Sequence, residues 1–435
     1  MRTRVITLLL SAILFTAGLF TPLQAGVPIA RPVNSRASGD VLLQGFHWNS
    51  CRSNTPWWTI INRLAPNMAS SGISMVWLPP SSHSASCEGY LPNMLYTLDS
   101  NYGTQDQLKQ AIASLHNSGI KVLGDIVINH RVGTKDWADF TNPVWGPDAV
   151  VSDDEWPGAK GAPDTGAGFN AGRDIDHTKA YVRKSIIDWM NWLRHDIGYD
   201  GWRFDYVKGY APVYTGMYID ATSPYFSVSE LWPDLDLNNT DAHRQQLCDW
   251  MDAIKGKSAV FDFTTKGILQ QAVAHSEYWR LRDRNGKPAG LIGWWPQNAV
   301  TFLDNHDTGP SIGDKTKIPT RSTNKSGQNL WAFPSDKVAM GYAYIMTHPG
   351  IPSVYWTHFY DWGTQLHNEI AALIQLRRSM GINPVSKVEI LAADNTQYVA
   401  AIDGKVILKL GGGNWQAAQG WHTALTGNGY IIWTR

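Results

Sequence analysis

Residues 201–207 have the sequence Gly-Trp-Arg-Phe-Asp-Tyr-Val, a short, largely apolar run with an acidic residue at position 205. Similar runs recur along the chain, and segments with helical periodicity, such as 105–118 and 180–193, lie between most of them. The other runs are 41–46, 75–78, 122–128, 226–231, 259–263, 300–303 and 353–356. This alternation predicts βαβ units of the α/β class, and eight units predict a closed (β/α)8 TIM barrel. Functional residues of such a barrel lie in the loops after the strand C-termini.

Two changes of pattern predict how the chain is divided. After the third run, residues 131–176 form a stretch rich in Gly, Pro and Asp that is too long for an ordinary loop, which predicts an inserted subdomain. After about Arg378 the chain changes to short alternating segments with turns, which predicts a small antiparallel β domain, assigned to 375–435. The barrel is then expected to comprise residues 40–130 and 177–374.

The N-terminus has the pattern of a targeting segment. Arg2 and Arg4 precede an apolar run over 5–20, and small residues follow up to Ala25. This order predicts a secretory signal peptide over 1–25, then a loose arm over 26–39 and a secreted, extracellular protein. The run is shorter than a membrane span requires, so we expect no membrane insertion.

Composition limits the choice of partner. The chain has 435 residues, with 37 Lys and Arg against 37 Asp and Glu, so its net charge is zero. A neutral chain has no electrostatic attraction for nucleic acid, and we expect none to bind. The 21 tryptophans and 17 tyrosines suggest flat surfaces on which sugar rings stack, although most of these rings could be core. We expect a monomer that binds a neutral ligand.

Three acidic residues are expected at one rim of the barrel. Asp205 and Glu230 each end an apolar run, and Asp307 lies shortly after another. Any one of them alone would be explained by an ion pair or a helix cap. Together they match the needs of glycoside hydrolysis, which uses a carboxylate nucleophile and a second carboxyl that protonates the leaving oxygen. Arg203 lies two residues before Asp205, on the same face of the strand, and can keep that carboxylate ionised.

Four ordered motifs resemble the signature regions of α-amylases in glycoside hydrolase family 13. They are Asp125-Ile-Val-Ile-Asn-His130, Gly201-Trp-Arg-Phe-Asp-Tyr-Val-Lys-Gly209, Ser229-Glu230 and Phe302-Leu-Asp-Asn-His-Asp307. The segments Glu88-Gly-Tyr-Leu-Pro92 and Gly293-Trp-Trp-Pro296 are similar to the plant-type branch of that family. The resemblance implies a retaining, endo-acting α-amylase that hydrolyses internal α-1,4 bonds of starch-like glucans. A transglycosylase with the same acids, or an inactive starch-binding relative, are the alternatives.

The resemblance also implies a role for each residue of the site. Asp205 would be the nucleophile, Glu230 the acid that later acts as the base, and Asp307 the third acid, which binds hydroxyl groups of the sugar at the cleavage point. The remaining substrate-binding residues would be Tyr90, His130, Arg203, Lys208 and His306. Tyr90 would stack on the sugar ring, and Lys208 would reach the leaving-group side.

The inserted subdomain resembles the calcium-binding segment of plant-type amylases. The resemblance implies a Ca²⁺ site with side-chain ligands from Asn129, Asp164 and Asp174 and carbonyl ligands from Ala167 and Gly209. Hard oxygen ligands of this kind suit calcium. Gly168 departs from the plant pattern, in which an acidic residue commonly follows the alanine, so the resemblance does not carry over further calcium sites.

Two more features concern the rim and the surface. Cys51 and Cys87 follow the first two strands and are expected to form a disulfide, whereas Cys248 lies in a helical segment and is explained as a small buried hydrophobe. The resemblance implies a surface starch site at Trp294 and Trp295, away from the cleft. The alternative is that one of these rings belongs to the core.

Overall fold

A computed structural model describes residues 39–134, 137–310 and 332–435. The predicted signal peptide over 1–25 and almost all of the arm over 26–39 lie outside these ranges. None of the helices within them has the length and apolar character that a membrane span requires.

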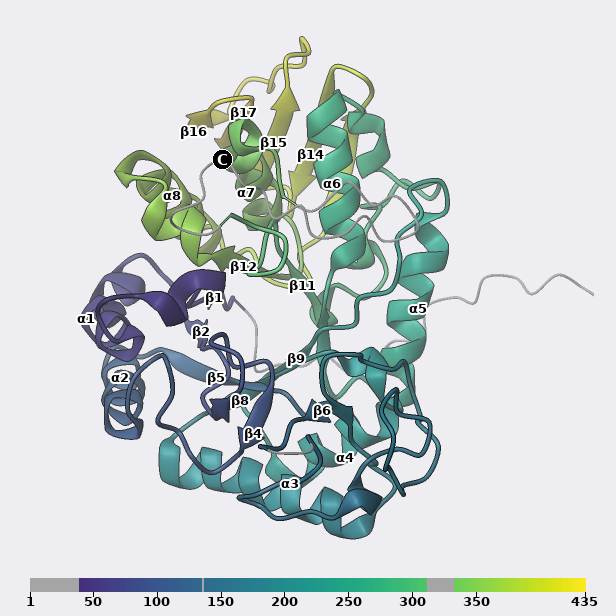
Figure 1. The fold of residues 1–435 in the computed structure, drawn as a ribbon. Helices are drawn as coiled ribbons and strands as arrows, with labels where there is room; N and C mark the ends of the chain where they lie inside the picture. The colour runs from purple at the N-terminus through teal and green to yellow at the C-terminus, as the bar shows by residue number, and fades with distance from the viewer. Residues whose placement is uncertain (1–38, 135–136, 311–331) are drawn as a thin grey trace, which may run out of the picture. The chain divides into compact units, whose positions relative to one another are not determined.

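Eight parallel strands close into a barrel (Figure 1), which confirms the predicted α/β architecture. Their order around the barrel is β1-β12-β11-β10-β9-β8-β5-β2, and β1 pairs with β2 to close it. The strands are β1 (Leu42–Gln44), β2 (Met75–Trp77), β5 (Lys121–Ile126), β8 (Gly201–Phe204), β9 (Ser227–Ser229), β10 (Ala259–Phe261), β11 (Ala299–Thr301) and β12 (Ile351–Tyr355). Every strand coincides with one of the apolar runs to within a few residues.

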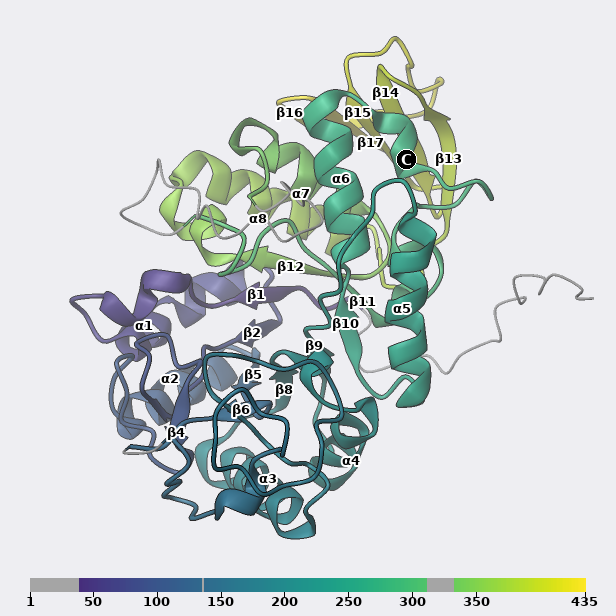
Figure 2. The ribbon, with the colours of Figure 1, turned by 45° about the vertical axis from the view of Figure 1, so that its right-hand side comes forward.

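The barrel strands alternate with α-helices, which surround them in Figures 1 and 2. The helices are α1 (Trp57–Ser70), α2 (Gln105–Asn117), α3 (Ala180–Trp192), α4 (Pro212–Thr222), α5 (Thr240–Ala253), α6 (Phe263–His275), α7 (Val338–Thr347) and α8 (Thr364–Ser379). In α2 the local sequence determines both the start and the buried face. Thr104 and Gln107 form a capping box, and the buried residues Leu108, Ala111, Ile112 and Leu115 recur with helical spacing.

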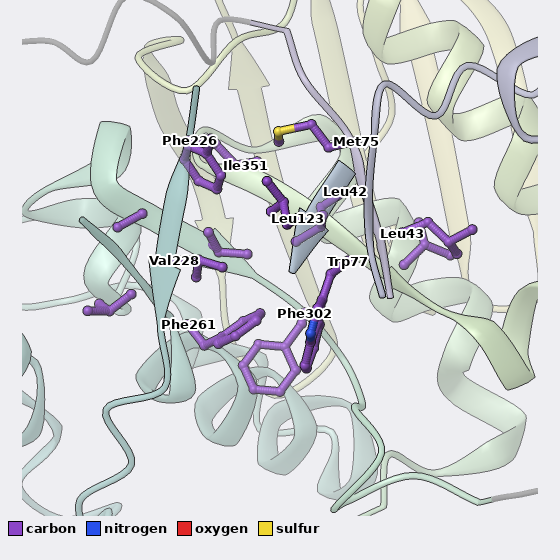
Figure 3. Close-up of a cluster of buried hydrophobic side chains, with 14 of the residues drawn as sticks. Leu42, Leu43, Met75, Trp77, Leu123, Phe226, Val228, Phe261, Phe302 and Ile351 are labelled. Carbon is purple, nitrogen blue, oxygen red and sulfur yellow. The ribbon is translucent and has the colours of Figure 1, made fainter. Parts of the chain in front are cut away.

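The core of the barrel is filled by large apolar side chains from different strands. Figure 3 shows Trp77, Phe261 and Phe302 packed together. The ring centroid of Phe261 lies 5.5 Å from that of Trp77 and 5.5 Å from that of Phe302. All three residues are buried. Because these side chains fill the barrel interior, the polar residues that follow the strand C-termini are attached to a rigid, packed core.

Register places the acidic residues side by side. Phe204 at the end of β8 pairs with Ser229 at the end of β9, so the next residues of the two strands, Asp205 and Glu230, are neighbours. Asp125 of β5 pairs directly with Arg203 of β8. Neighbouring strands lie about 4.8 Å apart, so this register alone brings the groups within contact range.

The remaining strands form three smaller sheets. A five-stranded antiparallel sheet has the order β13-β14-β15-β17-β16, made of β13 (Val388–Ala393), β14 (Gln397–Ile402), β15 (Val406–Gly411), β16 (His422–Gly427) and β17 (Tyr430–Thr434). Two short pairs at the rim were not predicted: β3 (His83–Ser84) with β4 (Pro92–Met94), and β6 (His130–Arg131) with β7 (Arg173–Asp174).

The predicted end of the barrel at residue 374 is wrong, because it falls inside α8. This helix continues to Ser379, with Arg377 fully buried and donating to the carbonyl oxygens of Met346, His348 and Gly350. A boundary inside a continuous hydrogen-bonded helix is physically unreasonable, so the last barrel helix extends to residue 379.

Candidate active site

Three carboxyl groups meet one buried guanidinium at the C-terminal rim of the barrel. Arg203 Nη1 lies 2.8 Å from Asp125 Oδ1 and 2.6 Å from Asp205 Oδ1, and Nη2 lies 2.9 Å from Glu230 Oε1. The Arg203 side chain is fully buried. Arginine suits this position because its planar fork can bind several carboxylates at once. One residue therefore fixes Asp205 and Glu230 relative to each other.

Burial raises the pKa of both carboxyl groups. The pKa of Glu230 rises to about 8, and that of Asp205 to about 7, in each case against the opposing effect of Arg203. Negative charge on Asp205 and Asp307 adds to the effect of burial on Glu230. Since Glu230 has the higher pKa, it retains its proton to higher pH than Asp205. The pair can thus supply one ionised and one protonated carboxyl group at the same pH.

Asp125 supports this arrangement, although its sequence position did not predict a role for it. Its Oδ2 accepts hydrogen bonds from Tyr90 Oη at 2.9 Å and from Trp77 Nε1 at 3.0 Å. The Arg203 guanidinium also lies over the Trp77 ring, 4.7 Å from its centroid. Its position at the start of the motif Asp125-Ile-Val-Ile-Asn-His130 was the signal that the sequence offered for Asp125. The contact with Arg203 could not be seen in the sequence, because Arg203 is 78 residues away in the chain.

Flat rings line the rim beside these acids. The rings of Tyr90 and His306 are parallel, with centroids 5.0 Å apart, and Trp48 is parallel to both at 6.1 and 6.0 Å. His306 Nδ1 accepts a hydrogen bond from Gln44 Nε2 at 2.9 Å, and its Nε2 lies 3.4 Å from Asp307 Oδ2. Trp48 and Gln44 were not predicted. Asp307 is more exposed than the other two acids, with 25% of its side chain accessible.

His130 lies behind Tyr90. Its Nε2 donates to the Tyr90 carbonyl oxygen at 2.7 Å, and its ring stacks on Phe169 with centroids 3.9 Å apart. Burial lowers the pKa of His130 to about 4, so the ring is neutral at neutral pH. In this structure His130 supports the loop that carries Tyr90, and the expected contact with a sugar stays a prediction.

Lys208 lies at the exposed side of the site. Its Nζ donates to the Trp232 carbonyl oxygen at 3.4 Å and lies over the Tyr206 ring, 5.1 Å from the centroid. It follows Asp205 through the 3-10 turn η5 (Val207–Gly209). A lysine ammonium at this position can contact a ligand that extends out of the site.

The residues of the expected calcium site lie close together. Asn129 Nδ2 donates to Asp174 Oδ1 at 3.0 Å, while Asn129 Oδ1 is buried without a hydrogen-bond partner. A Cβ atom on Gly209 would clash with that oxygen, so the glycine backbone passes directly beside it. The backbone N–H of Ala167 donates to the carbonyl of Lys208, which joins this segment to the same turn.

The charge of this cluster favours a cation. Burial raises the pKa of Asp174 to about 7, and Asp164, Glu155 and Asp154 raise it further. Burial also raises the pKa of Asp164, and nearby acidic residues add to that effect. Asn129 Oδ1 and the carboxylates of Asp164 and Asp174 are the hard oxygen donors that Ca²⁺ prefers. The residues present therefore fit a calcium ion.

Asp154 and Glu155 are additional acidic residues of this cluster that were not predicted from the sequence. Their ligand atoms and that of Asp174 all lie within 4.8 Å of one another. Glu155 Oε1 lies 2.5 Å from the point where a Cβ of residue 168 would be, so it occupies the space that Gly168 leaves empty. The acidic run at 153–155 was visible in the sequence, but its distance from Asp174 was not.

A disulfide joins Cys51 and Cys87, with Cα atoms 5.8 Å apart. Cys248 is buried in α5, away from this pair. Beside the disulfide, Arg52 forms a 2.7 Å ion pair with Glu88. These contacts hold the loop that leads to Tyr90.

The prediction that Trp294 and Trp295 together form an exposed surface starch site is wrong. Trp295 is buried, with only 2% of its surface accessible, and packs against Gly256. Trp294 is partly buried, with the Arg244 guanidinium 3.8 Å from its ring centroid. Because Trp295 belongs to the core, the two rings cannot share one exposed surface.

Plant amylases are similar to this chain over most of its length. "Probable alpha-amylase 2" of Arabidopsis thaliana is 43% identical over 412 residues, which cover 92% of this chain and 94% of the relative. "Alpha-amylase 3, chloroplastic" of the same plant is 41% identical over 94% of this chain, which spans about half of that relative (46%). A "Glucan 1,4-alpha-maltotetraohydrolase" of Stutzerimonas stutzeri is 33% identical over 82% of this chain and 65% of the relative.

The predicted extracellular location is contradicted by these relatives. One of the two similar plant proteins is named chloroplastic, so the prediction of an extracellular location is wrong. The physical reason is that a targeting segment is an address read by a receptor, so its own residues do not fix the destination.

Solved structures and family comparisons agree on the fold. An α-amylase of Anoxybacillus matches with a TM-score of 0.65 at 16% identity, covering 91% of this chain and 95% of that one. The family "Alpha amylase, catalytic domain" matches residues 57–144, and "Alpha-amylase C-terminal beta-sheet domain" matches residues 379–434. Together with the site and the plant relatives, these matches show that the chain belongs to the α-amylase family of glycoside hydrolases.

Proposed function

We propose that this protein is an endo-acting α-amylase that hydrolyses internal α-1,4 bonds of starch-like glucans with retention of configuration. The observation that carries the proposal is the pairing of Asp205 and Glu230 at the ends of adjacent strands, both held by Arg203. Retaining glycosidases need two carboxyl groups about 5–5.5 Å apart, and neighbouring parallel strands lie about 4.8 Å apart.

The two carboxyl groups differ in a way that supports distinct roles. Asp205 makes the shorter contact with Arg203 and is the better candidate for the ionised nucleophile that attacks the anomeric carbon. Glu230 has the higher pKa and would protonate the leaving glucosidic oxygen. After the leaving group departs, the same carboxylate would take a proton from water, which then releases the sugar from the ester on Asp205.

The surrounding residues would bind the sugar at the cleavage point. Tyr90 would stack on its apolar face, while Asp307 and His306 would form hydrogen bonds with its hydroxyl groups. Hydrogen bonds that strengthen as the ring flattens lower the barrier selectively, because they favour the transition state over the bound substrate. Lys208, at the exposed side, would contact the part of the glucan that leaves first.

We also propose that Ca²⁺ is held by Asn129, Asp164 and Asp174 with the carbonyls of Ala167 and Gly209. The buried, unpaired Asn129 Oδ1 supports this assignment. The ion would be structural, joining the inserted subdomain over 131–176 to the turn that follows Asp205. The barrel itself would comprise 40–130 and 177–379, followed by a C-terminal β domain that acts with it in a monomer.

Two substitutions test the catalytic assignment. Asp205→Asn and Glu230→Gln should each lower kcat on soluble starch by about 10³-fold or more, because each removes a step that no other group performs. Asp188→Asn is a suitable control, since this residue forms an exposed ion pair with Lys184 in α3. Proton NMR of the first products should show the α-anomer.

Two results would contradict the proposal. A β-anomer as the first product would exclude retention, and near-normal activity in either variant would exclude the assigned role. Products with new linkages, without a matching rise in reducing ends, would instead indicate a transglycosylase.

A further inference from the structure

Tyr206, the residue after Asp205, has an unusual backbone conformation. Its φ of 44° and ψ of 46° lie in the left-handed region, which is unfavourable for a residue other than glycine. Such a conformation persists only where the surroundings impose it, and it commonly marks a functional position. Two sets of contacts, one on each side of the residue, impose it here.

On one side, the backbone contacts Glu230. The N–H of Tyr206 donates to Glu230 Oε2 at 3.3 Å, and the next N–H, that of Val207, donates to the main-chain carbonyl of Glu230 at 3.3 Å. Arg203 holds the other carboxyl oxygen, Oε1. The orientation of the Glu230 carboxyl therefore depends on the left-handed turn at Tyr206.

On the other side, the phenol contacts the inserted subdomain. Tyr206 Oη donates to the Gly168 carbonyl at 3.0 Å, and its ring meets Phe169 with centroids 5.1 Å apart and an interplanar angle of 62°. Burial raises the pKa of this phenol to about 12, so it remains a hydrogen-bond donor at neutral pH. A phenylalanine here would keep the ring contact and lose the hydrogen bond.

We propose that Tyr206 is a positioning residue for proton donation: its side chain, held by Gly168 and Phe169, fixes the left-handed turn whose N–H orients the Glu230 carboxyl toward the leaving oxygen. This inference rests on the proposed function, in which Glu230 is the acid. Tyr206 itself transfers no proton. It supplies geometry, and small errors in geometry cost a large part of a catalytic rate.

The test compares two substrates that need different amounts of proton donation. Maltoheptaose has a poor leaving group, whereas the chloronitrophenol of an aryl maltotrioside leaves with little assistance. The quantity measured is kcat/KM, because it reports the steps up to formation of the glycosyl-enzyme. Tyr206→Phe should lower kcat/KM for maltoheptaose about 5- to 20-fold, with a change of about 2-fold or less for the aryl substrate.

Two further variants make the test specific. Tyr181→Phe is the matched control, because Tyr181 is a tyrosine of α3 whose hydroxyl donates to Asp148 of the inserted subdomain, and it should change neither substrate. Tyr206→Gly permits the left-handed backbone but removes the ring, and it should lower the maltoheptaose rate further than Tyr206→Phe. Melting curves of both Tyr206 variants should stay close to that of the wild type.

The outcomes separate this inference from the proposed function. Equal losses on both substrates, or no loss, in Tyr206→Phe would overturn the positioning role, provided that Glu230→Gln discriminates strongly between the two substrates. If Glu230→Gln does not discriminate, the acid role of Glu230 fails, and the inference about Tyr206 fails with it.

Discussion

Replacing Arg203 with methionine should destabilise the protein in a way that depends on pH. The wild-type guanidinium is fully buried and contacts Asp125, Asp205 and Glu230 at 2.6–2.9 Å. Removing one partner of a buried ion pair costs about 3–5 kcal/mol, because the remaining charge is left without compensation. With about 2.1 cal/mol/K of unfolding entropy per residue over a chain of 435 residues, that cost lowers Tm by about 3–6 °C.

The pH dependence follows from the direction of the pKa shifts. Burial raises the pKa of these carboxyl groups above their unfolded values, so the folded state binds more protons than the unfolded state as pH rises from about 4 to 8. Stability therefore falls with rising pH across this window. Without Arg203 the folded pKa values rise further and the fall is steeper, so the difference from wild type should be small near pH 5 and largest near pH 8.

Activity should fall for the same reason. Arg203 opposes the rise that burial causes in the pKa of Asp205, so removing Arg203 raises that pKa further and reduces the fraction of Asp205 that is ionised at pH 7. A neighbouring positive charge lowers an acid's pKa by about 1–3, so the ionised fraction falls by up to about 10- to 1,000-fold. We expect kcat/KM at pH 7 to fall by about 5- to 500-fold, with partial recovery at higher pH.

Arg377→Met is the matched control. Arg377 is also fully buried, but it donates only to carbonyl oxygens, which do not titrate. Its loss should lower Tm by a similar amount at pH 5 and pH 8. Melting curves of wild type and both variants at four pH values between 5 and 8 are sufficient. If the Arg203→Met difference is the same at pH 5 and pH 8, the three-carboxyl cluster is not what Arg203 stabilises.

Three other predictions concern pH, calcium and the disulfide. Wild-type kcat/KM should fall about tenfold per pH unit above the Glu230 pKa of about 8, and a profile that stays flat to pH 10 would contradict the acid role. Chelation should lower Tm and activity together, with recovery on adding Ca²⁺, and Asn129→Ala should weaken that recovery; a chelator that leaves Tm unchanged would argue against the site. Cys51→Ser with Cys87→Ser should lose about 3–4 kcal/mol of stability, because the disulfide closes a loop across 36 residues, whereas Cys248→Ser should keep the disulfide, as a thiol assay of the unreduced protein would show.

Local sequence patterns were sufficient for the order of the barrel strands and of the helices between them. The residues of the barrel strands are buried except Lys121 at the start of β5, and the capping box of Thr104 and Gln107 marks the start of α2. These signals are local, because a residue's preference for strand, helix or cap depends on its neighbours in the chain. The domain boundary predicted at residue 374 falls inside α8, since an amphipathic helix has no sharp compositional edge.

The candidate acids could also be predicted, because a strand that ends in Asp or Glu presents that group at the rim of a parallel barrel. Their mutual arrangement could not be predicted in the same way. Asp125 meets Arg203 only through the pairing of β5 with β8, and Glu155 fills the space beside Gly168 only because the inserted segment folds back on itself. Neither contact has a spacing along the chain that would reveal it.

The sequence by itself determined the alternation of strands and helices, the acids at the strand ends and the resemblance to α-amylases. Only the tertiary structure decided that Arg203 joins three carboxyl groups, that Trp295 belongs to the core, and that Tyr206 links Glu230 to the inserted subdomain. The physical reason is that preferences for secondary structure act over a few neighbouring residues. Burial, pKa shifts and ion pairs instead depend on groups that meet only when distant strands and loops are packed together.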